Sequence, residues 1–595
     1  MLKEKVQQLK EKIMNNKPAA IALVVLVLVL VGILVFVLGT GGSEKGKKDG
    51  DSQKELSVST PGEALNNDKS NGDKNDKKPS SDKDTDEKED GKDEAAGETS
   101  SGEAGEETSS GTQNQNGSTG GSTGGSTGGT SNGKDTVQKN QNTMYQQLFD
   151  LNNKITIRLD ISDDQLKLMQ SDYKSGNDTY RMVSKMTVTI GSTAYELYEV
   201  GVRIKGNTSR VDVINGGNVN DRNLIHMRLK FNETFDGTEY GSSAKKWSSE
   251  SLKKERKNRT FATLTGLELK WNRNFDSTYV ANCYANYMFK ALGVYAQSTS
   301  LANIVFGGYN YGVYTIYEPV DTTFIKKNFQ TANQGGDLYK CAWGEKSNGK
   351  GGGWSGASYL SETSSSIGVE TDGKSYIYEL KTNKKKSNHS MLKKLITTLN
   401  GGSVSKANFG SVVEADNWVK FAAASYFVGN PDDMRNNNNN HYVYMMPNGK
   451  AIFIPYDTDR CFGITTSGKD MASFSPFAED TALAGKQSNA LYKGSVITRN
   501  NNYTQEYKNA LKTVAESGWM NYANYKKYYD MAYRNYSSVA IPDSNVHIYV
   551  KDFNSGNVER PSNSSLAFAE SSSRNTSVKD YMSKIMNTYT QAMNK

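Results

Sequence analysis

The sequence has very little cysteine and histidine. Only three cysteines occur in 595 residues, and they lie far apart without any CxxC pair. The four histidines are also scattered along the chain. The cysteines are Cys283, Cys341 and Cys461, and the histidines are His226, His389, His441 and His547. A disulfide framework, a zinc site and a histidine-based metal cluster are therefore all unsupported.

A strong excess of charge is missing as well. The net charge is only +7, and the region after residue 143 has no long stripe of lysine and arginine. We therefore expect no nucleic acid partner. The region before residue 143 does not have the composition of a globular domain, so the folded part is expected to begin near Thr143. It is too long for a single core, which favours two lobes or large insertions.

One apolar run, residues 19–39, is long enough to cross a membrane. Residues 19–38 read AAIALVVLVLVLVGILVFVL without a charge, and about 20 such residues span the hydrocarbon core of a bilayer. The lysine-rich segment before it should stay in the cytoplasm. A cleaved signal peptide is the alternative, but its apolar region would be shorter and no clear cleavage site follows. We predict a single-pass signal anchor, with the folded domain outside the membrane on a bacterial cell surface.

Residues 40–142 consist mainly of Gly, Ser, Thr, Asp, Lys and Glu, and the tract GSTGGSTGGSTGG repeats a small polar unit. Such a composition cannot bury enough apolar surface to offset the entropy of the chain. We predict a disordered tether that could span a cell wall. A Ser/Thr-rich segment that is itself a substrate for modification is the alternative.

The remaining sequence combines strand and helix patterns, which predicts an α+β fold. Strands are expected within 153–162, 185–191, 194–210, 224–231, 300–308, 311–321, 441–446 and 451–463. Helices are expected within 277–292, 391–400, 417–430, 503–518 and 520–536. Asp276 is a plausible N-cap of the first helix, and the strand pair at 300–321 should turn at Tyr309-Asn310. The Gly/Ser-rich residues 331–375 are expected to form an irregular insertion.

Two segments bring cations and polar turns together. In RIKGNTSR, residues 203–210, a basic strand meets a glycine and a small hydroxylated turn, where backbone N–H groups and nearby cations can hold phosphate. Taken alone, that segment is better explained as an ordinary hairpin turn. In LIHMRLKF, residues 224–231, alternation places Arg228 and Lys230 together, opposite the apolar face.

Two clusters of acids and amides are joined by a short hairpin. The segment GNPDDMRNNNNN ends just before the strand 441–446, and the strand 451–463, AIFIPYDTDRCFG, ends in Asp457 and Asp459. Since PNGK forms a tight turn, the hairpin returns both clusters to the same end. Carboxylates and amides are hard oxygen ligands suited to Mg²⁺ or Mn²⁺. Turn or cap residues are the alternative explanation of each cluster alone.

Five segments make the chain resemble the spore coat protein H (CotH) kinase family. They are GVRIKGNTSR, FDSTYVANCYANYMFKALGV, GYNYGVYTIYEPVD, GNPDDMRNNNNNHYVY and IPYDTDRCFG, and their order covers roughly residues 150–535. The resemblance implies a divergent bilobal protein-kinase-like domain that uses ATP and Mg²⁺ or Mn²⁺ to phosphorylate Ser/Thr of a protein. Protein kinases place a catalytic Asp, a metal-binding Asn and a second metal-binding Asp in the same order, although the strings HRD and DFG are absent here.

The expected organisation combines the anchor, the tether and this domain. Its parts are a cytoplasmic N-terminus (1–18), the anchor (19–39), the tether (40–142), an N-lobe-like part (143–330), the irregular insertion (331–375), a C-lobe-like part with the catalytic loops (376–540) and a C-terminal extension (541–595).

The resemblance also implies roles for individual residues. Asp432 or Asp433 would orient the substrate hydroxyl or accept its proton, and Arg228 and Lys230 compete for the role of the kinase lysine. The groups implied in ATP binding are Arg203, Lys205, Gly206, Asn207, Ser209 and, near the hinge between the lobes, Glu318. The groups implied in metal binding are Asn440, Asp457 and Asp459, and the sequence does not decide which of the two acids bridges the phosphates.

Two functions compete for this chain. The first is a membrane-anchored atypical Ser/Thr kinase whose partner is a protein with Ser/Thr-rich segments. The second is a non-catalytic surface protein on the same scaffold, binding cell-wall polymer, because ATP is scarce outside the cell and family resemblance does not establish catalysis. A metal-dependent hydrolase of surface polysaccharide is a third interpretation, against which the order of the motifs argues.

Overall fold

The computed structural model describes the folded part of the chain. The described residues are 140–206, 209–345, 354–360, 366–369, 376–402, 404–464, 470–478, 489–497, 502–551, 557–571 and 576–595. The predicted anchor 19–39, nearly all of the predicted tether and Asn207 lie outside them. Within the described residues, no helix has both the length and the apolar character that crossing a membrane requires.

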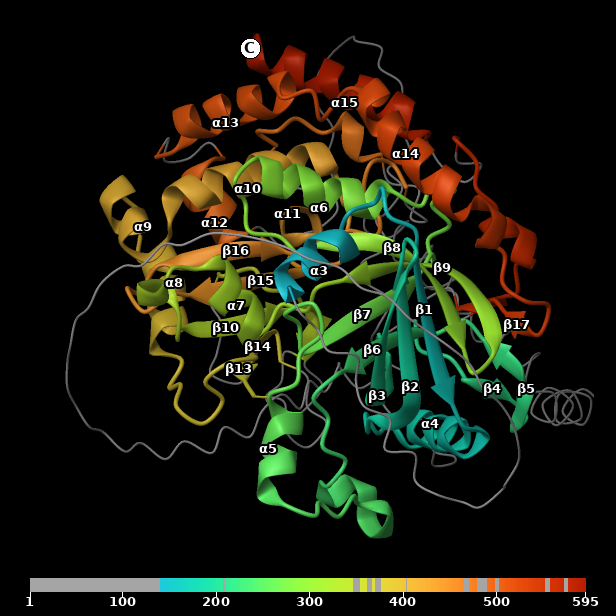
Figure 1. The fold of residues 1–595 in the computed structure, drawn as a ribbon. Coiled ribbons are helices and arrows are strands. Elements are labelled where there is room, and N and C mark those ends of the chain that lie inside the picture. The colour runs from blue at the N-terminus through green and yellow to red at the C-terminus, as the bar shows by residue number, and fades with distance from the viewer. Residues whose placement is uncertain are drawn as a thin grey trace, which may run out of the picture. The chain divides into compact units, whose positions relative to one another are not determined.

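The first part of the described chain forms a closed barrel of seven strands (Figure 1). Their order around the barrel is β1-β2-β3-β6-β7-β9-β8, and the parallel pair β1–β8 closes it. The strands are β1 Ile155–Ile161, β2 Arg181–Ile190, β3 Thr193–Lys205, β6 His226–Lys230, β7 Gly266–Trp271, β8 Thr299–Phe306 and β9 Tyr309–Tyr317. The strands expected up to residue 321 are therefore confirmed. Strand β7 was not among the expected strands.

The strands β3, β6 and β7 each have one apolar and one charged face, because side chains alternate along a strand. The apolar row Val202, Leu229 and Leu267 is fully buried in the barrel core. On the other face, Arg203 lies opposite Arg228, which in turn lies opposite Glu268. Lys205 and Lys270 follow on the same face two residues further along. This face supplies the cations of the candidate site.

Shorter elements flank the barrel. Helix α3 (Gln141–Leu148) buries Met144 and Leu148 in the barrel core, so the last two residues of the predicted tether, 141–142, are helical. Helix α4 (Asp163–Ser175) packs on β2 and β3. The connection from β6 to β7 carries α5 (Glu250–Lys257). The short strands are β4 Ile214–Asn215, β5 Asn218–Asn223 and β17 Val546–His547, which form one sheet, with β11 Gly344–Glu345 paired to β12 Trp354–Ser355 and β18 Val550–Lys551 paired to β19 Val558–Glu559.

A second sheet has the order β13-β14-β10-β15-β16. Its strands are β10 Asp337–Cys341, β13 Ile367–Gly368, β14 Tyr378–Leu380, β15 His441–Met445 and β16 Ala451–Pro455. The predicted hairpin of β15 and β16 is confirmed. The expectation of an irregular insertion at 331–375 is wrong for β10, which is buried along its whole length and pairs with both β14 and β15. A strand of only five residues is too short to show a clear alternation of apolar and polar side chains. Its pairing with the strands β14 and β15 decides that this segment is extended.

Helices complete the second part. They are α6 Ala281–Ala291, α7 Thr322–Asn328, α8 Ser390–Asn400, α9 Lys406–Val412, α10 Ala415–Val428, α11 Met434–Asn437, α12 Ala490–Ser495, α13 Thr504–Glu516, α14 Tyr522–Tyr536 and α15 Val578–Met593. The five predicted helices are confirmed. Helix α10 is buried on nearly every side because it packs on α6, α13 and β16, as Figure 1 shows for α6. In α15, the Tyr581 hydroxyl donates to the Phe427 carbonyl at the end of α10 (3.1 Å).

Two local predictions need correction. The turn between β8 and β9 lies at Gly307-Gly308 and not at Tyr309-Asn310, because both glycines adopt a positive φ that suits a tight turn. Asp276 does not occupy the N-cap position of α6, which begins at Ala281 after Val280. Its carboxylate nevertheless accepts a hydrogen bond from the Ala281 N–H (3.0 Å). The α+β class is confirmed, and the kinase-like bilobal arrangement stays a prediction.

Candidate functional site

The loop after α10 is built around the side chain of Asp432. Helix α10 ends at Gly429, which has a left-handed conformation. The Asp432 carboxylate accepts hydrogen bonds from the side-chain amides of Asn437 (2.6 Å), Asn439 (3.0 Å) and Asn440 (3.1 Å). The asparagine run therefore folds back on one acid and fixes its orientation.

Asp433 has a different environment from its neighbour. Its carboxylate caps α11 by accepting a hydrogen bond from the Asn436 N–H (2.8 Å). Burial raises the pKa of Asp433 to about 7. Asp433 therefore shapes the loop, while Asp432 is the acid that contacts Asn440.

The hairpin brings the two acidic clusters to one end, as the sequence predicted. His441 lies opposite Pro455, and the Asn440 carbonyl accepts a hydrogen bond from the Tyr456 N–H (3.2 Å). The next residue, Asp457, has a φ of 53°, which turns the chain sharply after β16. The Asn430 side chain donates to the Asp457 carbonyl (3.0 Å) and ties the two loops together.

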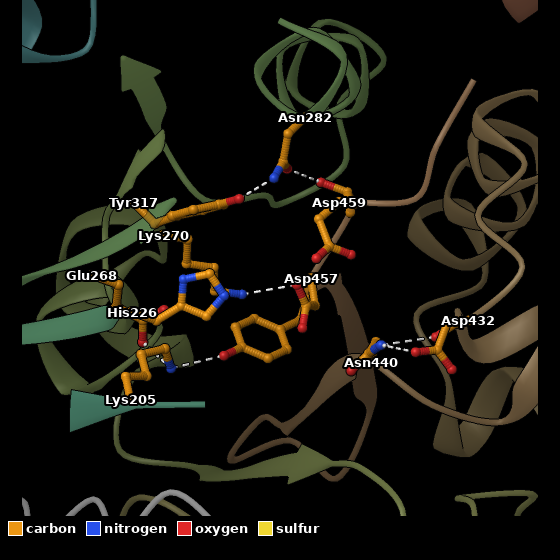
Figure 2. Close-up of polar contacts among 12 residues, drawn as sticks. Lys205, His226, Glu268, Lys270, Asn282, Tyr317, Asp432, Asn440, Asp457 and Asp459 are labelled. Atoms are coloured by element: carbon orange, nitrogen blue, oxygen red, sulfur yellow. Dashed lines mark hydrogen bonds and ion pairs between the residues drawn. The ribbon is translucent and has the colours of Figure 1, made fainter. Parts of the chain in front are cut away.

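Lys270 connects the barrel to this acidic end. Its Nζ lies 2.8 Å from the Asp457 carboxylate, and the side chains are 8% and 30% exposed. In Figure 2, Asp457 and Asp459 lie between Lys270 on one side and the Asn440–Asp432 pair on the other. Although burial acts against ionisation, Lys270 holds the pKa of Asp457 below its ordinary value. The ion pair therefore joins β7 to the segment that follows β16.

Asp459 is the less satisfied of the two acids. Within the described part of the chain, no side chain or backbone N–H donates a hydrogen bond to its carboxylate, although its own carbonyl accepts one from Asn274 (3.1 Å). Burial, and then the charge of Asp457, raise the pKa of Asp459 to about 7. A buried carboxylate without donors favours a cation beside it. The described residues hold no group of three His, Cys, Asp or Glu side chains arranged for a metal.

The residue between the two acids is fixed from α6. Thr458 is buried and donates its hydroxyl proton to Asn282. Asn282 in turn donates to the Tyr317 hydroxyl (Figure 2). Asn286 donates to the Thr458 hydroxyl (3.0 Å). These bonds tie the segment between Asp457 and Asp459 to α6.

The barrel cations do not all reach the acids. Lys205 is buried and lies 3.0 Å from Glu268, and Arg228 lies 3.6 Å from the same carboxylate. Lys230 pairs instead with Glu233 (3.2 Å), near the opposite end of β6. The cation that contacts Asp457 is Lys270, so neither of the two predicted candidates, Arg228 and Lys230, forms that pair. Lys270 could have been found from the alternation in GLELKW, where Glu268 and Lys270 share a face.

The two cations of the predicted phosphate turn have different surroundings, and Asn207 and Thr208 of that turn lie outside the described residues. Arg203 is buried and lies 3.4 Å from Asp178, with its guanidinium 5.3 Å from the centre of the Tyr180 ring. Gly206 has a φ of 107°, a conformation that residues with a Cβ rarely adopt, and a Cβ there would also crowd the Ser209 hydroxyl oxygen. Of the two strand cations, Lys205 is the one that approaches the acidic end.

Glu318 belongs to a separate cluster. Its carboxylate accepts hydrogen bonds from the Tyr145 hydroxyl (2.7 Å) and the Ser298 N–H (3.2 Å), and it forms an ion pair with Lys327. Glu318 is only 1% exposed. None of these partners belongs to the acidic end, so the structure does not bring Glu318 together with Asp457 or Asp459.

The sequence analysis also missed His226. This buried residue lies opposite Lys205 on β6, and its Nδ1 accepts a hydrogen bond from the Trp271 N–H (3.1 Å). Burial, and then the charge of Lys270, lower the pKa of His226 to about 3. The ring is therefore neutral at ordinary pH and lies among the barrel cations (Figure 2). His226 stands apart from the other histidines in the sequence, so no motif indicated a functional role for it.

Comparison with known proteins assigns the family. No curated protein sequence matches this chain. The model of the family described as "CotH kinase protein" matches residues 239–559. The match starts later than the predicted start near residue 150, so β3 and β6 precede it, whereas Lys270, Asp432, Asn440, Asp457 and Asp459 all lie within it. The chain belongs to the CotH kinase protein family.

Proposed function

We propose that this protein is an atypical protein kinase that transfers the γ-phosphoryl group of ATP to Ser/Thr of a protein. The observation that carries the proposal is the Lys270–Asp457 ion pair (2.8 Å), which joins the cationic face of the barrel to the acidic end of the β15–β16 hairpin. Positioning and electrostatic stabilisation account for most of the catalysis of phosphoryl transfer. A cationic face opposite clustered acids suits both tasks.

The donor set fits a hard divalent cation. The Asp459 carboxylate and the Asn440 Oδ1 atom accept no hydrogen bond from any described residue, and Asp457 uses one carboxylate oxygen for Lys270. Asp457, Asp459 and Asn440 would hold Mg²⁺ or Mn²⁺. When bound, the ion neutralises charge on the phosphates.

Two further groups have roles in the transfer. Asp432, oriented by three asparagine amides, accepts the proton of the substrate hydroxyl as that oxygen bonds to the γ-phosphorus. The bond from that phosphorus to the β–γ bridging oxygen breaks, and ADP leaves with the bonding electrons. Lys205 and Lys270 hold the phosphates. Asp433 caps α11 and supports the loop.

The decisive experiment measures phosphate transfer by the full-length protein. Labelled ATP with Mn²⁺ or Mg²⁺ should give labelled protein, and Asp457→Ala/Asp459→Ala should abolish the label. The matched control is Asp416→Ala, an exposed acid of α10 that pairs with Lys420. Transfer that survives in the double variant would refute the assigned site. No binding at millimolar ATP would favour a non-catalytic surface protein that binds cell-wall polymer.

The location of the domain is a separate proposal. We propose that residues 19–39 anchor the chain in the membrane with its N-terminus in the cytoplasm, which places the kinase domain and its protein substrate at the cell surface. The charge-free apolar run and the lysines before it support this topology. Protease added to intact cells should remove the domain. A domain that is protected until the cells are lysed would overturn this topology.

A further inference from the structure

Helix α15 (Val578–Met593) lies beyond the part of the chain that matches the family, which ends at residue 559. The helix is nevertheless part of the larger hydrophobic core and buries one face in it. The buried side chains are Val578, Tyr581, Met582, Ile585 and Tyr589. Of these, Tyr581 contacts both segments that carry the acids of the candidate site.

The two loops of the candidate site are each fixed at one end by the second sheet. The first loop, residues 430–440, connects α10 to β15, and the second loop, residues 456–463, follows β16. The pairing of β15 with β16 fixes the loop ends that adjoin the sheet. The other two ends, at Gly429 and Gly463, lie outside this pairing and need a different contact.

The Tyr581 hydroxyl supports the end of α10, where the first loop starts. Tyr581 is 1% exposed, and its hydroxyl donates a hydrogen bond to the Phe427 carbonyl (3.1 Å). This carbonyl lacks the usual helical donor, because the residue four positions later is Pro431, which has no N–H. Gly429, which ends α10, has a φ of 58°, and a Cβ there would collide with the Tyr581 hydroxyl. The hydroxyl therefore fixes the point at which the chain leaves α10.

The Tyr581 ring supports the end of the second loop. The Phe462 ring meets it edge-on, with ring centres 6.2 Å apart. Gly463 has a φ of 80°, and a Cβ there would lie 3.2 Å from the Tyr581 Cβ, closer than an ordinary contact. The Phe462 N–H donates to the Val428 carbonyl (2.9 Å), so α10 and the second loop also meet directly here. One side chain of α15 therefore contacts both loop ends that the hairpin does not fix.

A second contact of α15 lies on the chain that follows the second loop. The Thr588 hydroxyl donates to the Ala472 carbonyl (2.6 Å). The guanidinium of Arg435, which belongs to the first loop, donates to the nearby Ser475 carbonyl (3.0 Å). The first loop and α15 thus bind the same short segment, so the support that α15 gives to the site does not depend on Tyr581 alone.

We propose that Tyr581 is a positioning residue that holds the two loops at a fixed separation, so that α15 completes a site whose acids all lie within the family match. This inference deepens the proposed function and rests on it. The proton acceptor Asp432 lies on the first loop, and the metal-binding Asp457 and Asp459 lie on the second. A misplacement of about 1 Å between such groups can reduce a rate about a hundredfold. Tyr581 therefore acts on the transfer step and on metal binding, while the phosphate-binding lysines of the barrel are held independently of α15.

The test measures kcat, the KM for ATP and the affinity for Mn²⁺ alone, all with the full-length protein. Tyr581→Phe removes only the hydroxyl and should lower kcat about tenfold, as expected for one buried hydrogen bond, while the KM changes less than threefold. Tyr581→Leu also removes the ring and should lower kcat about a hundredfold and weaken Mn²⁺ binding at least threefold.

The matched controls come from Tyr589 on the same helix, whose ring packs on Phe427 with ring centres 5.4 Å apart. Tyr589→Phe and Tyr589→Leu make the same chemical changes without touching Gly429 or Gly463. They should change kcat and the Mn²⁺ affinity less than twofold. Thermal unfolding shows whether each variant is folded at the assay temperature.

Each outcome separates this inference from the kinase proposal. Equal losses of kcat in the Tyr581 and Tyr589 variants, or an unchanged kcat in Tyr581→Leu, would show that α15 only stabilises the fold and would overturn the inference. If the wild type binds Mn²⁺ but transfers no phosphate, weaker Mn²⁺ binding in Tyr581→Leu alone would support the positioning role and refute the kinase, whereas equal Mn²⁺ binding would overturn both. A wild type that neither binds Mn²⁺ nor transfers phosphate would also overturn both. If Tyr581→Leu does not fold, Tyr581→Phe decides the question.

Discussion

Two clusters in this molecule use the same pair of residue types, an acid and a lysine, in opposite ways. Glu318 is 1% exposed, and Tyr145, Ser298 and Lys327 all bind its carboxylate. Asp457 is 30% exposed and has one lysine partner, while Asp459 beside it accepts no hydrogen bond from the described residues. A satisfied buried acid stabilises the fold, and an unsatisfied one is available to a ligand. The difference separates a structural cluster from a candidate active site.

The largest effect is expected when Asp457 and Asp459, the two acids available to a ligand, are removed. Asp457→Ala/Asp459→Ala should lower the rate of phosphate transfer by at least about a thousandfold, since a single electrostatic group at such a site contributes on the order of 10²–10³. The variant leaves the buried Lys270 without its partner, and removal of the uncompensated Asp459 offsets part of that loss, so the unfolding midpoint should fall by no more than a few degrees. Rate assays and thermal unfolding check both statements. A large loss of stability would place these acids in the structural class.

The matching change in the Glu318 cluster should lower the stability of the fold and leave ligand binding nearly unchanged. Glu318→Ala leaves the Lys327 cation without its partner and should cost about 3 kcal/mol of unfolding free energy. The change should reduce nucleotide affinity less than threefold, because no partner of Glu318 belongs to the acidic end. Denaturant unfolding and calorimetry measure the two effects. A selective loss of ATP binding at unchanged stability would restore the role that family resemblance implied for Glu318.

The two neighbouring acids of the loop sharpen the comparison further. Asp432→Asn should lower the transfer rate about a hundredfold, as expected for the loss of a general base. Asp433→Asn should change it less than threefold, because asparagine caps a helix as well as aspartate does. Turnover rates at saturating ATP test this difference. Equal losses in both variants would contradict the separation of a reacting acid from a capping acid.

The smallest predicted effect concerns pH. Burial lowers the folded-state pKa of His226 to about 3 and that of His441 to about 4. The unfolded chain therefore binds more protons below pH 6.5, and the free energy of unfolding should fall by about 2 kcal/mol per histidine between pH 6.5 and 5. His226→Asn and His441→Gln should each flatten this dependence.

Ligand binding should distinguish these two histidines. His226 lies among the cations of the open cluster, so tripolyphosphate should weaken its contribution to the pH dependence. His441 is enclosed by the Tyr359 hydroxyl and the Asn439 carbonyl and should not respond. Unfolding measured against pH with and without tripolyphosphate checks this. If the ligand changed the contributions of both histidines to the pH dependence equally, the ligand would bind elsewhere.

Much of the chemistry could be predicted from local patterns. Alternation identified most barrel strands, and the PNGK turn was enough to show that Asp432, Asn440, Asp457 and Asp459 end on the same side. Lys270 and β10 were missed for different reasons. Lys270 lies in a strand whose charged face was overlooked, whereas β10 is too short to show a period and is a strand because β14 and β15 pair with it.

The sequence by itself determined the hairpin, its two acidic ends and the family, because these depend on short-range turn geometry and on motifs read in order. Only the tertiary structure decided which cation meets which acid. Arg228, Lys230 and Lys270 are similar in the sequence, but the antiparallel pairing of β6 and β7 places Lys230 and Lys270 at opposite ends of the two strands. Lys230 therefore pairs with Glu233, and Lys270 pairs with Asp457. Burial then decided which acids are satisfied, since hydrogen-bond donors to Glu318 come from residues as distant in the chain as Tyr145.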